Sequence, residues 1–99
     1  MYYRKLGRTG LDVSVIAFGG IMLNGVSRDS ADQIIERAVS AGINLFDVGP
    51  TYGNAQNILG PALEPFRDGV FLACKTEPDQ TGEEVRRDLE KSLELLRTD

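Results

Sequence analysis

The chain has 99 residues, of which 41% are hydrophobic and 26% charged, a balance typical of a globular domain rather than a disordered chain. Lys and Arg number 11 against 15 Asp and Glu, so the net charge is −4, which argues against nucleic-acid binding. The lone Cys74 excludes an internal disulfide, and no apolar run reaches the roughly 20 residues that span a bilayer. We therefore expect a reducing, cytoplasmic setting.

The first elements along the chain are predicted to be strands. Residues 3–13 predict a β-hairpin whose turn, residues 7–10, is bounded by glycines. Short apolar runs then predict strands at residues 13–18, 43–47 and 70–75. Runs of this kind are typical of a parallel sheet that is covered on both faces. Cys74 lies inside the third run, where alternation predicts a packed core thiol.

Three amphipathic patterns predict helices between and after these strands. The first is expected to begin at a capping box, Ser30-x-x-Gln33, and to end at Gly42. The second follows Asn54, and Pro61 inside it predicts a kink or two short pieces. The third begins at the capping box Thr81-x-x-Glu84.

The predicted order is therefore strand and helix in alternation, three times. Ile16, Ile43 and Val70 stand 27 residues apart in turn, a regular spacing that βαβ units produce. The sequence thus predicts one α/β domain, or a part of one.

Polar or glycine residues follow each of these strands. Gly19 and Gly20 end the first, Asp47 the second and Lys75 the third, while Tyr52 lies five residues beyond Asp47. In a parallel sheet these ends meet at one edge, where functional groups gather. An ammonium beside a phenol favours the phenolate, so such a tyrosine could exchange a proton with a carbonyl oxygen.

A purely structural interpretation of the same residues stays open at this point. An aspartate at a strand end can serve as a loop anchor, and a lysine at a strand exit can be an ordinary surface residue. The Gly19-Gly20 pair is no GxGxxG fingerprint and suits a tight strand-to-helix turn.

Several separated motifs resemble the opening of an aldo-keto reductase. They are residues 4–11 (RKLGRTGL), 17–20 (AFGG), 46–53 (FDVGPTYG), 59–60 (LG), Lys75 and 88–99 (DLEKSLELLRTD). The resemblance implies an N-terminal β-hairpin plus three βα units of a (β/α)8 TIM barrel. We expect residues 1–99 to be the N-terminal part of a single such domain, with the remainder missing.

The resemblance also implies NADPH-dependent reduction of small aldehydes and ketones without a metal. Tyr52 matches the proton donor of the family, Lys75 the lysine that activates it, and Asp47 the carboxylate that partners this lysine. Gly19, Gly20 and Ile21, together with Asp47, match residues at the nicotinamide end of the cofactor.

Two departures from the family pattern stand out. Gln56 occupies a position where the family usually has glutamate. The fourth catalytic residue of the family is a histidine at the end of the next barrel strand, and the chain contains no histidine. We expect that strand to lie beyond Asp99, so that the 99 residues alone are an inactive fragment.

Two other interpretations remain. The chain could belong to a non-enzymatic binding or regulatory protein with this fold, since a fold does not fix an activity. It could also be a stand-alone, doubly wound α/β module. Neither the physiological substrate, the choice between NADPH and NADH nor the oligomeric state can be predicted from these residues.

Overall fold

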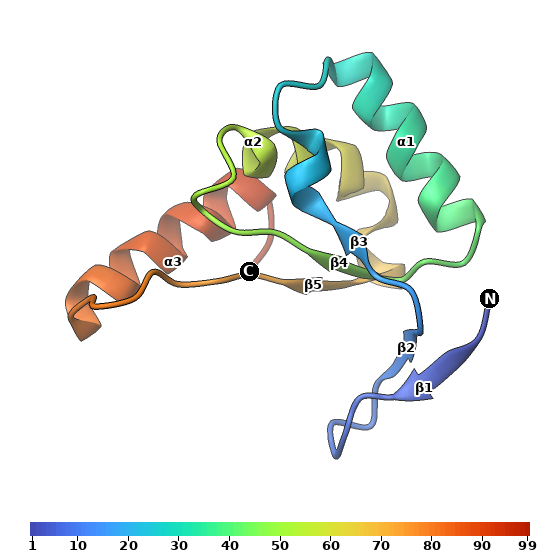
Figure 1. Ribbon diagram of the computed structural model, residues 1–99, viewed down its shortest axis with the longest axis horizontal. Helices are drawn as coiled ribbons and strands as arrows, with labels where there is room; N and C mark the ends of the chain where they lie inside the picture. The colour runs from blue at the N-terminus through green and yellow to red at the C-terminus, as the bar shows by residue number, and fades with distance from the viewer.

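An antiparallel hairpin opens the chain in the computed structural model, which describes residues 1–99. Strands β1 (Tyr3–Lys5) and β2 (Asp12–Ser14) pair with each other, and Figure 1 shows them set apart from the helices. Gly7 and Gly10 adopt positive φ angles of 53° and 80°, which confirms the predicted glycine-bounded turn.

The remaining strands form a parallel sheet in the order β3-β4-β5. These strands are β3 (Phe18–Gly19), β4 (Leu45–Asp47) and β5 (Phe71–Ala73). Their register places Gly19, Asp47 and Ala73 side by side, so the three carboxyl ends lie level at one edge. The central strand β4 is therefore paired on both sides, whereas β3 and β5 are edge strands.

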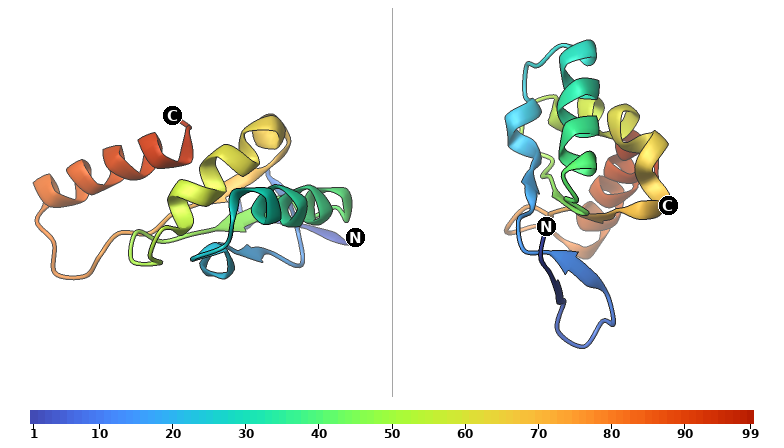
Figure 2. Two further views of the ribbon diagram at one scale, coloured as in Figure 1. Left: turned by 90° about the horizontal axis from the view of Figure 1, so that it is seen from above. Right: turned by 90° about the vertical axis from the view of Figure 1, so that its right-hand side faces the viewer.

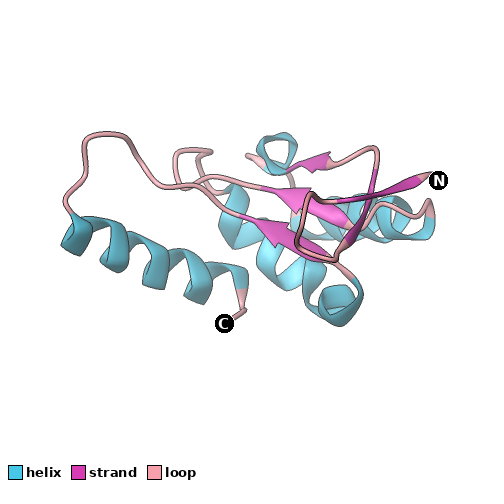
Figure 3. Cartoon of the chain, turned by 90° about the horizontal axis from the view of Figure 1, so that it is seen from below, coloured by secondary structure: helices cyan, strands magenta, loops and turns pink.

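Helical segments follow each strand of this sheet. After β3 come the 3₁₀ turn η1 (Gly20–Leu23) and α1 (Arg28–Ser40). After β4 come α2 (Ala55–Leu63) and η2 (Glu64–Gly69), and after β5 comes α3 (Gly82–Leu96). The three α-helices lie on the same side of the sheet, with α2 packed against both α1 and α3 (Figures 2 and 3). None of the helices is long and apolar enough to cross a membrane.

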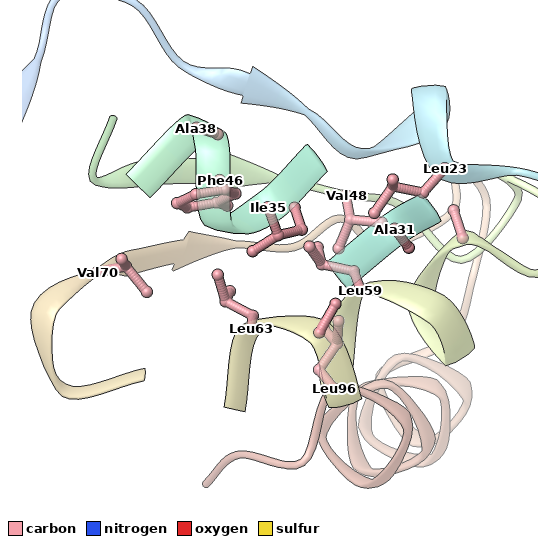
Figure 4. Packing of buried hydrophobic residues seen from close by; sticks show 12 residues of the cluster. Leu23, Ala31, Ile35, Ala38, Phe46, Val48, Leu59, Leu63, Val70 and Leu96 are labelled. Carbon is pink, nitrogen blue, oxygen red and sulfur yellow. The ribbon is translucent and has the colours of Figure 1, made fainter. Parts of the chain in front are cut away.

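The hydrophobic core fills the space between the sheet and these helices. Phe46, the middle residue of β4, is fully buried and points into this layer with Ile35 of α1 and Leu59 of α2 (Figure 4). Alternation along β4 then turns its neighbours Leu45 and Asp47 toward the opposite face of the sheet. The core thus fixes the orientation of Asp47 at the sheet edge.

The predicted strand at residues 13–18 is wrong in its extent, because the structure divides it in two. Val13 and Ser14 belong to β2, whereas Phe18 begins β3. Between them the chain bends, and the Ser14 hydroxyl donates to the carbonyl oxygen of Ile16 at 2.7 Å. Ser14 is also tied to the chain before β4, because its backbone N–H donates to Asn44 Oδ1 at 2.7 Å. Ile16 therefore lies in the bend, and the registered positions are Phe18, Phe46 and Leu72.

Two of the three predicted helix starts are confirmed, and one is wrong. The Thr81–Glu84 capping box is present, and α2 begins directly after Asn54. By contrast, the cap of α1 is Ser27, whose hydroxyl accepts from the Ser30 backbone, so this helix begins earlier than expected. Pro61 does not divide α2 into two α-helical pieces, since the helix continues through it to Leu63.

Candidate active site

Three of the predicted site residues meet at the carboxyl edge of the sheet. Asp47 is the last residue of β4, Lys75 lies two residues beyond β5, and Tyr52 lies in the loop between β4 and α2. Because β4 and β5 are parallel and adjacent, the segments that leave them run side by side. The fold therefore brings together groups that are 28 residues apart in the chain.

An ion pair and an aromatic ring form the centre of this site. The Lys75 ammonium donates to Asp47 Oδ1, and Lys75 Nζ lies 5.3 Å from the centroid of the Tyr52 ring. The side chains of Lys75 and Asp47 are 43% and 41% exposed, so the pair is open to a small molecule from solvent. An ion pair exposed to this degree contributes little to the stability of the fold.

The surroundings of Lys75 favour its charged form. The hydrogen bond to Asp47 is the largest cause that raises the pKa of Lys75, and a contact with Tyr52 raises it further. Partial desolvation opposes both effects but does not outweigh them. Lys75 is thus a permanent ammonium at neutral pH, held by a carboxylate on one side and facing a phenol on the other.

Gly49 allows Tyr52 and Lys75 to lie over the chain that leaves β4. A Cβ atom at this position would be 3.3 Å from Tyr52 Cζ and 3.4 Å from Lys75 Cδ, tighter than most real contacts. The Tyr52 ring is itself half-buried and packs against the hydrophobic core. The sequence alone does not reveal this role of Gly49, because nothing local shows which side chains cover it.

The two glycines at the end of β3, Gly19 within the strand and Gly20 directly after it, border the same site. A Cβ atom at Gly20 would lie 2.8 Å from the carbonyl oxygen of Asp47, so this residue lets the two strand ends approach closely. Gly19 has no neighbouring atom within 4 Å of the corresponding position. Ile21, which follows Gly20, is 53% exposed. The structure therefore places the open backbone of Gly19 beside Asp47, and the exposed Ile21 lies two residues further along the chain.

A buried polar contact behind the site was missed by the sequence interpretation. Gln56 of α2 is buried, and its Nε2 donates to Ser92 Oγ of α3 at 3.0 Å and to Cys74 Sγ at 3.4 Å. Cys74 itself is exposed, so the prediction of a packed core thiol is wrong. The physical reason is that β5 ends at Ala73, and alternation no longer applies beyond it.

Comparisons with known proteins agree with this arrangement. The model of the aldo/keto reductase family matches residues 15–99. L-galactose dehydrogenase of Arabidopsis thaliana is 34% identical over 97% of this chain and 34% of its own length. Aldo-keto reductase YhdN of Bacillus subtilis is 33% identical over the whole chain and 35% of its own length.

A solved structure gives the same result for the fold. A putative aldo-keto reductase from Pseudomonas aeruginosa superposes with a TM-score of 0.88 at 33% identity, over 98% of this chain and 42% of that one. The predicted hairpin and three βα units of a barrel are thereby confirmed. The chain spans about a third of the length of the two curated relatives named above. It belongs to the aldo/keto reductase family.

Proposed function

We propose that these residues form part of the active site of an oxidoreductase that reduces small aldehydes and ketones to alcohols. One observation carries the proposal, namely the Lys75–Asp47 ion pair that lies against the Tyr52 ring at the carboxyl edge of the sheet. Family membership, and relatives named as a reductase and a dehydrogenase, support chemistry of this class. We further propose that residues 1–99 are the first part of one barrel domain.

In this proposal Tyr52 is the group that exchanges the proton. Its phenol donates to the carbonyl oxygen of the substrate as negative charge develops there, and in the reverse direction takes the proton from the alcohol. The Lys75 ammonium stabilises the negative charge left on the phenol oxygen. Asp47 keeps Lys75 in place and charged, and therefore acts through Lys75 rather than on the substrate.

A nicotinamide cofactor, NADPH in our proposal, would supply the hydride when bound. Gly19, Gly20, Ile21 and Asp47 would hold its nicotinamide end. The residues fit this use because the space over Gly19 is open, so that a flat ring could approach the backbone beside Asp47. The exposed Ile21 offers it an apolar contact.

Replacement of Tyr52 tests the proposal in the protein encoded by the complete reading frame that contains this chain. We expect Tyr52→Phe to lower kcat for a panel of aldehydes at least about 100-fold, since it removes the proton donor. The Kd for NADPH should change less than twofold, because the ring and its packing remain. NADPH oxidation and fluorescence titration measure the two quantities.

Tyr2→Phe is the matched control, because Tyr2 directly precedes β1 and has 84% of its surface exposed. Unchanged turnover in Tyr52→Phe would contradict the assigned role. If the unsubstituted protein binds NADPH but reduces no member of the panel, the regulatory interpretation holds instead. We also infer that residues 1–99 alone do not catalyse the reaction. Their parallel sheet keeps two unpaired edges, and they contain no histidine to serve as the fourth catalytic residue that the family resemblance implies.

A further inference from the structure

Two asparagines join the loops that follow β3 and β4. Asn24 stands at the end of η1, and Asn54 lies two residues beyond Tyr52. Asn24 Oδ1 accepts a hydrogen bond from the backbone N–H of Asn54 at 3.3 Å, and Asn54 Oδ1 accepts one from the backbone N–H of Gly25 at 2.9 Å. Each side chain thus binds the backbone of the other loop, and we call this reciprocal pair the asparagine clasp.

Gly53 shows how closely the two loops approach. Its φ angle is +58°, a conformation that favours glycine, and a Cβ atom on it would lie 2.1 Å from Asn24 Oδ1. Asn24 therefore lies directly against the residue that follows Tyr52. The backbone after Tyr52 is held by contact as well as by hydrogen bonds.

The missing side-chain cap of α2 is a second, independent observation that Asn54 serves to join the two loops. Asn is a preferred N-cap residue, yet the Asn54 side chain makes no bond to its own helix. By contrast, Ser27 and Thr81 cap α1 and α3 with their hydroxyl groups. Asn54 thus directs its only acceptor bond to a loop 29 residues earlier in the chain. Positions where a residue does not make its locally preferred hydrogen bond are typical of functional sites.

We propose that Asn24 and Asn54 are positioning residues that hold the Tyr52 loop so that the phenol ring stays over Lys75. The proposal rests on the reductase function described above. Both asparagines are exposed, so their hydrogen bonds compete with water and contribute little to global stability. Their effect is instead local, on where the ring lies. Contact with Tyr52 also helps to raise the pKa of Lys75, so the charged state of Lys75 depends in part on where the Tyr52 ring lies.

Single and double substitutions in the complete protein test the clasp. We expect Asn24→Ala and Asn54→Ala each to lower kcat about 10-fold, since displacement of a reacting group by about 1 Å can cost 100-fold. The double variant should lose little more than either single one, because both substitutions open the same clasp. The Kd for NADPH should stay within twofold. Asn57→Ala, an exposed asparagine on α2 without a side-chain hydrogen bond, is the matched control and should keep full activity.

Rescue separates positioning from a general structural role. Both asparagines act only as acceptors in the clasp, so Asn24→Asp and Asn54→Asp should restore kcat to within about threefold of the unsubstituted protein. The clasp proposal fails if the alanine variants keep kcat within twofold. It also fails if aspartate does not rescue them, or if the loss of kcat matches a loss of folded protein in thermal melts.

A spectroscopic measurement makes the test independent of turnover. Nuclear Overhauser effects between the Tyr52 ring and the Lys75 side chain should weaken in the alanine variants and return in the aspartate variants. Unchanged effects in the alanine variants would overturn the clasp proposal. If the unsubstituted protein has no reductase activity, the proposed function fails while this measurement still decides whether the clasp places Tyr52.

Discussion

Gly19 and Gly20 are adjacent in the chain but have opposite surroundings. A side chain on Gly20 would press on the backbone oxygen of Asp47 and on Val48 Cβ, at 2.8 and 2.9 Å. A side chain on Gly19 would meet only open space, and its φ and ψ of −83° and 105° suit any residue. One glycine is therefore required by packing, whereas the other leaves a surface free.

This contrast makes a prediction about two alanine variants. Gly20→Ala should lower the free energy of unfolding by about 1–3 kcal/mol, because β3 or β4 must shift to admit the methyl group. Gly19→Ala should change it by less than about 1 kcal/mol, yet weaken NADPH binding if the nicotinamide lies over this residue. Urea unfolding and fluorescence titration of the complete protein check the two effects. Equal destabilisation by both substitutions would contradict the packing argument.

The site residues that could be predicted from the sequence are those at strand ends. Asp47 and Lys75 close or follow apolar runs, so the rule that parallel strands end at one edge brings them together without further information. Asn24, Asn54 and Gln56 could not be found in this way. Their partners are defined by loop and helix packing across distant parts of the chain, and no periodic pattern records such contacts.

At the scale of elements, the sequence predicts whether a segment is a helix or a strand better than it predicts where that segment begins and ends. Helix and strand periodicity identifies each segment, but residues 13–18 form one apolar run in which no residue marks the change from hairpin to sheet. That change depends on Asn44, which lies before β4 and bonds both the N–H of Ser14 and the carbonyl of Asp12. A tertiary contact thus divides what local preference would leave continuous.

Helices α2 and α3 pack closely at Gly60, a contact that cannot be predicted from the sequence. A Cβ atom at Gly60 would lie 2.2 Å from the Leu95 carbonyl oxygen and 2.8 Å from Leu96 Cα, so α3 packs directly on the backbone of α2. Gly60 beside Pro61 indicates a helix interruption when only the sequence is considered. In the structure α2 continues through both residues, and this glycine serves close packing instead.

We expect Gly60→Ala to lower the free energy of unfolding by about 3 kcal/mol, because the atoms that it would meet belong to a backbone that cannot rotate away. This loss outweighs the roughly 1 kcal/mol by which alanine favours a helix over glycine. Gly82→Ala is the matched control, since no atom lies within 4 Å of its Cβ position at the start of α3. It should leave stability unchanged or slightly higher. Chemical denaturation of the complete protein measures both free energies of unfolding, and equal effects would refute the close-packing explanation.

The whole molecule has a core on one side of its sheet and open edges at both ends. Only 19 of the 99 residues are buried, and Val15, Ile16, Ile21 and Met22 around β3 are each between 49% and 72% exposed. Strands β3 and β5 each have one unpaired edge. Unpaired edges next to exposed apolar side chains are templates for association with another chain.

Residues 1–99 expressed alone should therefore associate and unfold without a sharp transition. We expect elution that depends on concentration, binding of a hydrophobic dye and no NADPH oxidation. Ile16→Lys should shift the population toward monomer, because a charge beside the β3 edge opposes pairing. Ile34→Lys is the control, because Ile34 is 40% exposed but lies on helix α1 and has no unpaired backbone edge beside it, so this substitution should have no such effect. A monomer with a cooperative, two-state melt would contradict the prediction. It would favour a stand-alone α/β module, because a three-stranded sheet that is stable in isolation needs no further strands.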